Sequence, residues 1–276
     1  MQKVIFMHEL PEYSEYIDAS VIEYIADGQI ETYESFEKYD LIAFDWYDLK
    51  EASAPPAQIL IYVDADDIFY ICENETSYAV ARRFFIEDVS NERCAYLFFK
   101  DLLRGGVKYI EQLENRVARL DDDVSDGTES GLRENIIETR NEILRAEKYY
   151  AQLEFLFDEI CENDNDLFSD EILKYFEVIH NRSVRLASLA SGLREYITQV
   201  RESYQSQIGI EQNNLMKVFT MVTSIFLPLT LIVGWYGMNL KMPEFGWRYG
   251  YVFVAGLSVA VCIVWFILFK KKRWFK

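Results

Sequence analysis

The sequence is poor in the residues that build metal clusters, disulfide frameworks and nucleic-acid interfaces. Its 276 residues include four cysteines and two histidines, and no two cysteines stand at a paired spacing. This argues against a zinc cluster built within one chain, and it favours free thiols over disulfides. Lysine and arginine total 28 against 46 acidic residues, a net charge of −18. Such acidity argues against nucleic acid as a partner and favours cations.

Two further features are missing. The start, MQKVIFMHEL, lacks an extended apolar core and a small-residue cleavage site, so no secretory signal is predicted. No nucleophile–histidine or phosphate-loop constellation occurs, so an enzyme is not expected.

Two long apolar runs stand near the end of the chain. Val218 to Tyr236 is 19 residues without a charge, and Tyr249 to Phe269 is 21 more. A helix of about 20 residues crosses the roughly 30 Å of a bilayer core, so both runs are predicted membrane spans. A basic tail, 270–276, follows the second run and includes Lys270, Lys271, Lys272 and Arg273. The positive-inside rule then predicts an inner (cytoplasmic) membrane protein with both termini in the cytoplasm.

The first 90 residues predict a small cytoplasmic α/β domain. Segments 4–7, 41–49 and 59–74 are rich in β-branched and aromatic residues and are bounded by turn signals, as strands are. Residues 13–26 are predicted to form a helix between strands. Acidic stretches such as DADD at 64–67 do not fit the spacing of a calcium loop and are interpreted as solvated turns.

From residue 91 to 166 the pattern predicts two antiparallel charged helices. Ile110, Leu113, Val117, Leu120 and Val124 share one helical face, and DGTESG at 126–131 interrupts the pattern. A second face runs from Leu132 to Ile160 and ends at CENDND.

A longer pattern follows, with apolar or small residues alternating at spacings of four and three. This seam consists of Ile172, Phe176, Ile179, Ser183, Leu186, Ala190, Leu193, Ile197, Val200 and Tyr204. It predicts a helix packed along other helices, continuous from about 169 to 237. A helix of that length would be about 100 Å long, which suggests a bundle of identical chains.

Continuing that period into the first span selects a stripe of Asn213, Thr220, Thr223, Leu227, Thr230 and Gly234. Polar groups in a span usually face protein or water, although a lone threonine often bonds its own backbone. The stripe carries no charge, so its oxygens suit a hydrated cation, with Leu227 and Phe219 as hydrophobic constrictions.

The stretch NNLMKVFTMVTSIFLPLTLIVGWYGMN at 213–239, followed by MPE and a basic tail, resembles the CorA family of magnesium transport channels. The resemblance implies an α+β fold, a homopentameric funnel and a stalk helix that continues into the pore. It places the outer mouth at Gly237, Met238 and Asn239, and an inner polar ring at Asn213. The implied segments are a domain at 1–90, helices at 91–166, a stalk at 167–217, spans at 218–237 and 249–269, and an external loop at 238–248.

Departures from the family concern the loop and the stalk. The loop carries Lys241, Pro243 and Glu244, and it is shorter and less acidic than the family's usual one. In the stalk, Val178 and Asn181 stand where acidic residues are expected. Glu177 and Glu202 remain as candidates for a regulatory magnesium site.

The resemblance implies divalent cations as cargo or regulators, no other cofactor, and partners limited to further copies, lipid and cations. Magnesium is the expected ion, with cobalt and nickel next. Two alternatives stay open: a zinc transporter of the same superfamily, with or without proton coupling, and a membrane-tethered scaffold.

Overall fold

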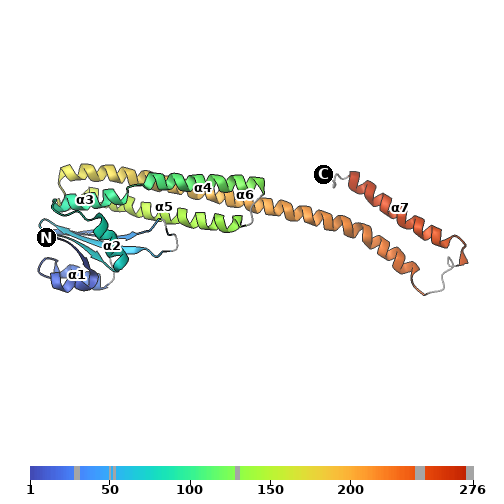
Figure 1. The fold of residues 1–276 in the computed structure, drawn as a ribbon, viewed down its shortest axis with the longest axis horizontal. Helices are drawn as coiled ribbons and strands as arrows, with labels where there is room; N and C mark the ends of the chain where they lie inside the picture. Colours follow the sequence, from blue (N-terminus) through green and yellow to red (C-terminus); the bar gives the residue numbers. More distant parts are fainter. Residues whose placement is uncertain (28–31, 50, 52–53, 128–130, 240–245, 272–276) are drawn as a thin grey trace. The chain divides into compact units, whose positions relative to one another are not determined.

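The computed structural model describes residues 1–27, 32–49, 51, 54–127, 131–239 and 246–271. The chain divides into two compact units, Met1–Glu202 and Ser203–Lys276 (Figure 1). Lys241, Pro243, Glu244, Lys272 and Arg273 lie outside the described residues.

A five-stranded sheet forms the centre of the first unit. Its strands are β1 (Gln2–Phe6), β2 (Tyr33–Ser35), β3 (Tyr39–Trp46), β4 (Ala57–Asp64) and β5 (Ile68–Cys72). Their order is β1-β5-β4-β3-β2, with β1 parallel to β5 and all other pairs antiparallel. The stretch 59–74 is therefore two strands and not one. DADD forms the turn between them, because a carboxylate oxygen of Asp64 accepts the amides of Asp66 and Asp67 at 2.9 and 2.6 Å.

Helices cover both faces of this sheet. A 3₁₀ helix, η1 (Met7–Tyr13), and α1 (Ala19–Asp27) pack on one face, around Ile5, Leu41 and Phe69. The helix expected at 13–26 is thus shorter, since α1 begins only after Asp18, whose carboxylate accepts the Ser20 amide at 2.9 Å. On the other face lie α2 (Glu75–Phe84), α3 (Asn91–Leu102) and α5 (Leu132–Glu162).

Three helices, not two, occupy residues 91–166. Gly105, at φ +84°, separates α3 from α4 (Gly106–Asp126), and Gly131, at φ +100°, precedes α5. Such left-handed backbone is accessible mainly to glycine, so these positions fix the helix ends. The predicted apolar face of α4 is buried at all five positions.

Helix α6 runs without interruption from Asp170 to Tyr236, 67 residues, and α7 follows at Gly250–Lys271. Nine of the ten seam residues are buried; Tyr204 is half-buried. The chain's own helices cover the seam: the Phe176 ring lies 5.9 Å from Tyr96 and 6.3 Å from Phe157. The predicted packing of the seam along other helices is therefore confirmed, and those helices belong to the same chain.

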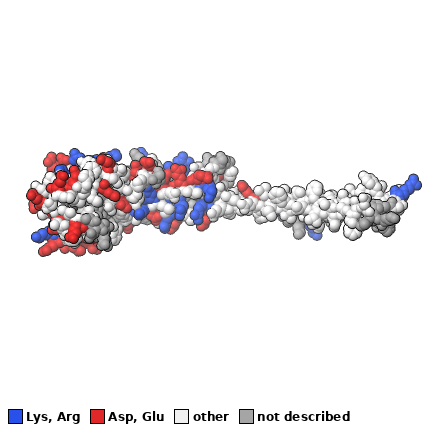
Figure 2. All heavy atoms as spheres, turned by 90° about the horizontal axis from the view of Figure 1, so that it is seen from below, with Lys and Arg blue, Asp and Glu red and all other residues white. Residues whose placement is uncertain are grey.

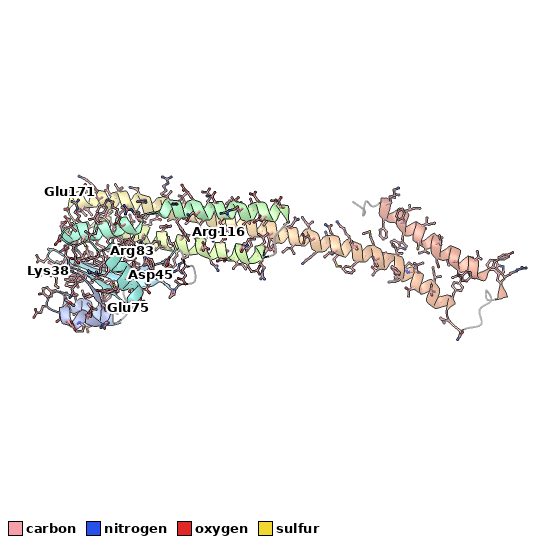
Figure 3. The ribbon with its side chains drawn as sticks, viewed as in Figure 1. Lys38, Asp45, Glu75, Arg83, Arg116 and Glu171 are labelled. Carbon is pink, nitrogen blue, oxygen red and sulfur yellow. The ribbon has the colours of Figure 1, made fainter. Side chains whose placement is uncertain are left out.

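Polar contacts add to this packing. Arg116 on α4 (labelled in Figure 3) pairs with Glu142 on α5, and Arg194 on α6 pairs with Glu147 at 3.5 Å. The fully buried Asp40 on β3 accepts the side-chain amide of Asn165 at 2.7 Å, which ties the α5–α6 turn to the sheet. Burial raises the pKa of Asp40. Because exposed ion pairs contribute little, apolar packing dominates.

Phe176 tests this conclusion. Phe176→Ala removes a fully buried ring from the junction of α3, α5 and α6. We expect the unfolding free energy to fall by about 3–5 kcal/mol. Phe155→Ala on α5 is the matched control, because that ring is 54% exposed. Thermal unfolding of the detergent-purified chain, followed by circular dichroism, measures both; equal melting temperatures would contradict the assignment.

Candidate functional site

The second unit contains the last part of α6 and all of α7, and most of the apolar side chains on these two helices are exposed. The most apolar 18-residue windows of α6 and α7 have mean hydropathies of 1.9 and 2.8, and 0% and 6% of them is buried. A soluble core helix would be mostly buried, whereas here Phe219 and Leu227 are 65% and 70% exposed. Charged side chains gather over the first unit, while the second is largely uncharged (Figure 2). Both helices are long and apolar enough to span a membrane.

The threonines of the predicted stripe bond their own helix. Thr220, Thr223 and Thr230 donate their hydroxyl protons to the carbonyls four residues earlier, at 2.7, 2.7 and 2.8 Å. The alternative, in which each threonine bonds its own helix backbone, is therefore what the structure shows. It does not exclude a role at the surface, because a donating hydroxyl keeps lone pairs that can accept a hydrogen bond. Each threonine oxygen is left as an acceptor.

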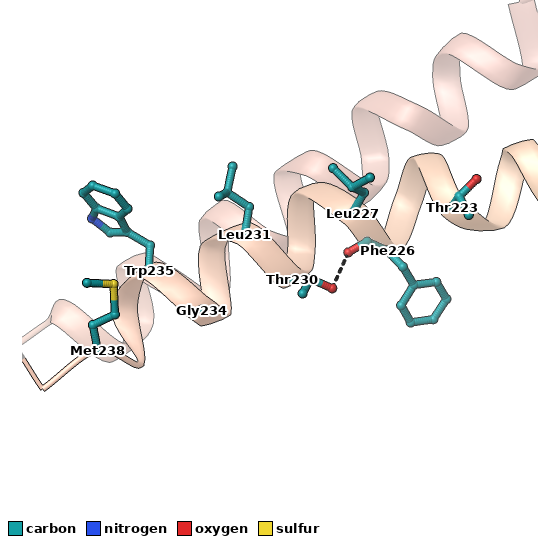
Figure 4. A pocket seen from close by; sticks show the side chains of 8 residues that line it. All are labelled: Thr223, Phe226, Leu227, Thr230, Leu231, Gly234, Trp235 and Met238. Atoms are coloured by element: carbon teal, nitrogen blue, oxygen red, sulfur yellow. Dashed lines mark hydrogen bonds between the residues drawn. The ribbon is translucent and has the colours of Figure 1, made fainter.

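A shallow groove on α6 collects part of the stripe (Figure 4). Thr223, Leu227, Thr230, Gly234 and Met238 line it, whereas Asn213, Phe219 and Thr220 lie on earlier turns and do not. Sequence spacing did not identify the other three lining residues, which flank the stripe: Phe226, Leu231 and Trp235. Each of these three residues directly precedes or follows a stripe residue in the sequence, and this was the only sequence feature that could have identified them.

The stripe is not on the face of the seam. Asn213 follows Tyr204 by nine residues, and at about 100° per residue this is about two and a half turns. Counted along α6, the stripe therefore lies about half a turn from the seam, and its description as a continuation of the seam is wrong. In the first unit α3, α4 and α5 cover the seam, and in the second unit all six stripe residues are exposed.

The spacing of the stripe continues towards the start of α6. Steps of four and three residues back from Asn213 select further residues, all of them solvent-exposed in the single chain, and we call this set the exposed face of α6. Its members are Lys174, Val178, Asn181, Arg185, Ser188, Gly192, Glu195, Gln199, Glu202, Ser206 and Gly209. Glu202 belongs to this exposed face, but Glu177 does not. The structure thus does not bring the two predicted regulatory residues together.

The predicted mouth lies at the end of α6. The Gly237 amide donates to the Val233 carbonyl at 2.8 Å, and a Cβ at Gly237 would lie 2.7 Å from that oxygen. Glycine is therefore needed for this close approach, and not for a left-handed φ, which Gly237 does not adopt. Met238 and Asn239 follow it and are both exposed. Lys270 and Lys271 end α7, where basic residues favour the negative helix terminus.

Among the described residues, no group of three or more His, Cys, Asp or Glu side chains is placed to hold a metal ion. Outside the apolar helices, burial is the largest cause of most of the raised pKa values. Burial, followed by the charges of Glu177 and Asp158, raises the pKa of Cys161 to about 11. The arrangement on α6 is therefore a row of neutral oxygens and apolar side chains, which can contact a solvated ion but not ligate it with fixed charges.

Comparison with known proteins supplies relatives of the same kind. "Cobalt/magnesium transport protein CorA" of Thermotoga maritima is 25% identical over 166 residues, 60% of this chain and 47% of that protein. "Putative metal ion transporter YfjQ" of Bacillus subtilis is 29% identical over 182 residues, 66% of this chain and 57% of that protein. The chain thus spans about half the length of these relatives.

A solved structure shares the fold. The complete structure of the CorA magnesium transporter from Methanocaldococcus jannaschii matches with a TM-score of 0.76 at 19% identity, over 99% of this chain and 90% of that one. The family model described as CorA-like Mg2+ transporter protein matches residues 11–271. The chain therefore belongs to the CorA-like Mg2+ transporter family.

Proposed function

We propose that this chain transports divalent metal cations across the cytoplasmic membrane, with both termini in the cytoplasm. Magnesium is the proposed ion, and cobalt and nickel follow it. The observation that carries the proposal is the stripe on α6: hydroxyl acceptors and apolar residues alternate along an uncovered helix, and Gly237, Met238 and Asn239 follow directly after its end. The proposed function is accordingly that of a transporter and not of an enzyme.

Neutral oxygens suit the water shell of a small divalent ion. Magnesium loses its waters reluctantly, and a water bound to the ion presents its hydrogens outward as donors. The complement is a wall of acceptors, which the backbone-bonded threonines and the Asn213 and Asn239 amide oxygens provide. A carboxylate ring would hold the ion more tightly and slow its release. Phe219 and Leu227 would close the path by excluding water.

One chain does not enclose a path, so the proposal requires several copies around α6. The exposed face of α6 has the spacing of a helix that packs in a parallel bundle. Five copies is the number that the family resemblance implies. In such a bundle the five Glu202 side chains would approach one another, which makes Glu202 the better candidate for regulation by intracellular magnesium. Glu177 is left outside that arrangement.

Zinc transport coupled to protons is the competing proposal. Proton coupling needs a titratable group along the path. The stripe from Asn213 to Gly234 contains none, and Lys217, beside it, is hydrogen-bonded to Asn214 at 3.3 Å. This favours transport that does not depend on a proton gradient. A scaffold would have no use for the stripe at all.

Asn239 gives the direct test of transport. We expect Asn239→Ala to lower magnesium uptake into proteoliposomes about 10- to 100-fold, because a hydrogen bond to a charged partner contributes about 1.5–3 kcal/mol. Asn214→Ala is the matched control, since Asn214 stands beside the stripe and its replacement should change uptake little.

A comparison of ions in the same proteoliposomes distinguishes the competing proposals. Magnesium uptake and zinc uptake are each measured with and without a proton gradient. Zinc uptake that needs the gradient would establish the competing proposal, and the absence of any flux would support the scaffold.

Thr223 tests the role of the acceptors. Its hydroxyl donates to two carbonyls, those of Phe219 and Thr220, at 2.7 and 3.2 Å. Thr223→Val keeps the shape and removes the acceptor, so we expect magnesium uptake to fall about fivefold, the equivalent of about 1 kcal/mol. Thr223→Ser keeps the acceptor and should retain most activity. Equal uptake by both variants would show that the hydroxyl has no part in transport.

The assembly is tested by mass. Native mass spectrometry of the chain released from detergent is expected to give about five times 32.5 kDa. Arg185→Glu and Glu195→Arg, both on the exposed face of α6, should each weaken the assembly, whereas Glu154→Arg on α5 should not. A monomer at micromolar concentration would contradict the proposed bundle.

A further inference from the structure

Pro228 removes one hydrogen bond from the part of α6 that is apolar enough to span a membrane. The helix runs from Asp170 to Tyr236 with Pro228 inside it. In an α-helix the amide of residue 228 donates to the carbonyl of Ser224, but proline has no amide hydrogen. The Ser224 carbonyl therefore lacks this bond. In the hydrocarbon core of a bilayer, a carbonyl without a hydrogen-bond donor is costly.

The side chain of Ser224 is a second polar group without a bond. The three threonines of the stripe each donate to a carbonyl of α6, and the Ser258 hydroxyl on α7 donates to the Val254 carbonyl at 3.0 Å. Among the described residues, the half-buried Ser224 hydroxyl makes no such bond. One residue in the span thus carries a carbonyl and a hydroxyl that both need a partner.

Ser224 lies beside the stripe. At about 100° per residue, it is about 40° from Thr220 and about 60° from Leu227 around the axis of α6. Leu231, which lines the groove together with Leu227, follows Ser224 by seven residues, or about two turns. The two polar groups of Ser224 therefore lie on the same side of α6 as the groove.

The depth of Ser224 places it between the two residues that are proposed to exclude water. It follows Phe219 by five residues and precedes Leu227 by three, about 7.5 Å and about 4.5 Å along the helix. Waters bound to magnesium present their hydrogens outward, so the ion needs acceptors at this depth. A carbonyl adds an acceptor that carries no proton of its own to the hydroxyls of Thr220 and Thr223.

We propose that the carbonyl and the hydroxyl of Ser224 form a contact for hydrated magnesium between Phe219 and Leu227, and that Pro228 keeps the carbonyl available. This assignment rests on the proposed function and makes Ser224 a further specificity-determining residue of the path. Hydrocarbon supplies no donor, and the stripe threonines and Ser258 have already used theirs, so water in the path supplies it. Backbone carbonyls already select ions in other channels.

Pro228→Ala tests the carbonyl, because alanine restores the amide that donates to it. We expect magnesium uptake into proteoliposomes to fall about fivefold, which is the effect of losing one hydrogen bond. The melting temperature should stay the same or rise, since proline inside a helix is destabilising. A role in folding alone would move uptake and melting temperature in the same direction. Full uptake by Pro228→Ala would overturn the proposal.

A backbone ester separates the free carbonyl from the shape of proline. Cell-free translation can place α-hydroxyalanine at position 228, which has an ester oxygen where alanine has its amide. This variant leaves the Ser224 carbonyl without its helical bond but has no proline ring. We expect it to retain most of the uptake that Pro228→Ala loses. An equal loss in both variants would assign the effect to the ring and overturn the role of the carbonyl.

Thiol labelling tests whether Ser224 meets water, independently of ion flux. The background carries Cys161→Ser and Cys262→Ser, and the two cysteines that remain are fully buried. Ser224→Cys should react with a membrane-impermeant cationic methanethiosulfonate at least about tenfold faster than Val222→Cys, because the reactive thiolate forms in water and not in hydrocarbon. Val222 is the matched control, since it lies at nearly the same depth, about 160° around α6 from Ser224, and is 47% exposed.

The two readouts distinguish failure of this proposal from failure of the proposed function. Equal labelling rates at the two positions would overturn the contact at Ser224 even if the parent chain carries magnesium. A parent chain without magnesium uptake would overturn the proposed function and the ion contact with it, whereas fast labelling of Ser224→Cys would still support water at this residue.

Discussion

A single helix with two opposite faces is the constraint on which the rest of this molecule depends. The seam of α6 is buried against the chain's own helices, with residues such as Phe176 and Leu186 fully enclosed. The opposite face is uncovered in the single chain along its whole length. Because both faces belong to one continuous helix, packing on the seam fixes the rotation of the helix about its axis, and thereby determines which residues are free to contact other molecules.

The sequence predicted those parts of the fold that depend on local periodicity. The faces of α4 and α5, the seam and the continuity of α6 were all correctly expected, because a buried stripe imposes its spacing directly. The number of helices between 91 and 166 was wrong, since a single glycine with positive φ separates α3 from α4. The prediction that the stripe continues the seam was also wrong, because spacings of three and four fit every face of a helix, and the nine residues from Tyr204 to Asn213 shift the face by about half a turn.

Contacts between distant segments could not be predicted in this way. Asp158 and His180, or Asp40 and Asn165, meet only after the α5–α6 turn has formed. The predicted roles of Asn213, Thr220, Thr223 and Asn239 remain predictions, while their exposure and the hydrogen bonds of the threonines are now defined. The family resemblance placed Gly237 at the outer mouth, and the structure adds a reason for glycine there, which is the close approach to the Val233 carbonyl.

The acidic residues and the uncharged stripe lie in different parts of the chain. Most of the acidic residues responsible for the net charge of −18 belong to the first unit, and the apolar helices carry almost none (Figure 2). A carboxylate within a membrane span would be costly to bury, and it would also bind a divalent ion strongly enough to slow its release. Acidic residues in water can raise the local concentration of cations without either penalty. Under the proposed function, neutral oxygens on α6 would then need only to distinguish a hydrated cation from other solutes, and acceptors whose own protons are held by the backbone would meet that requirement.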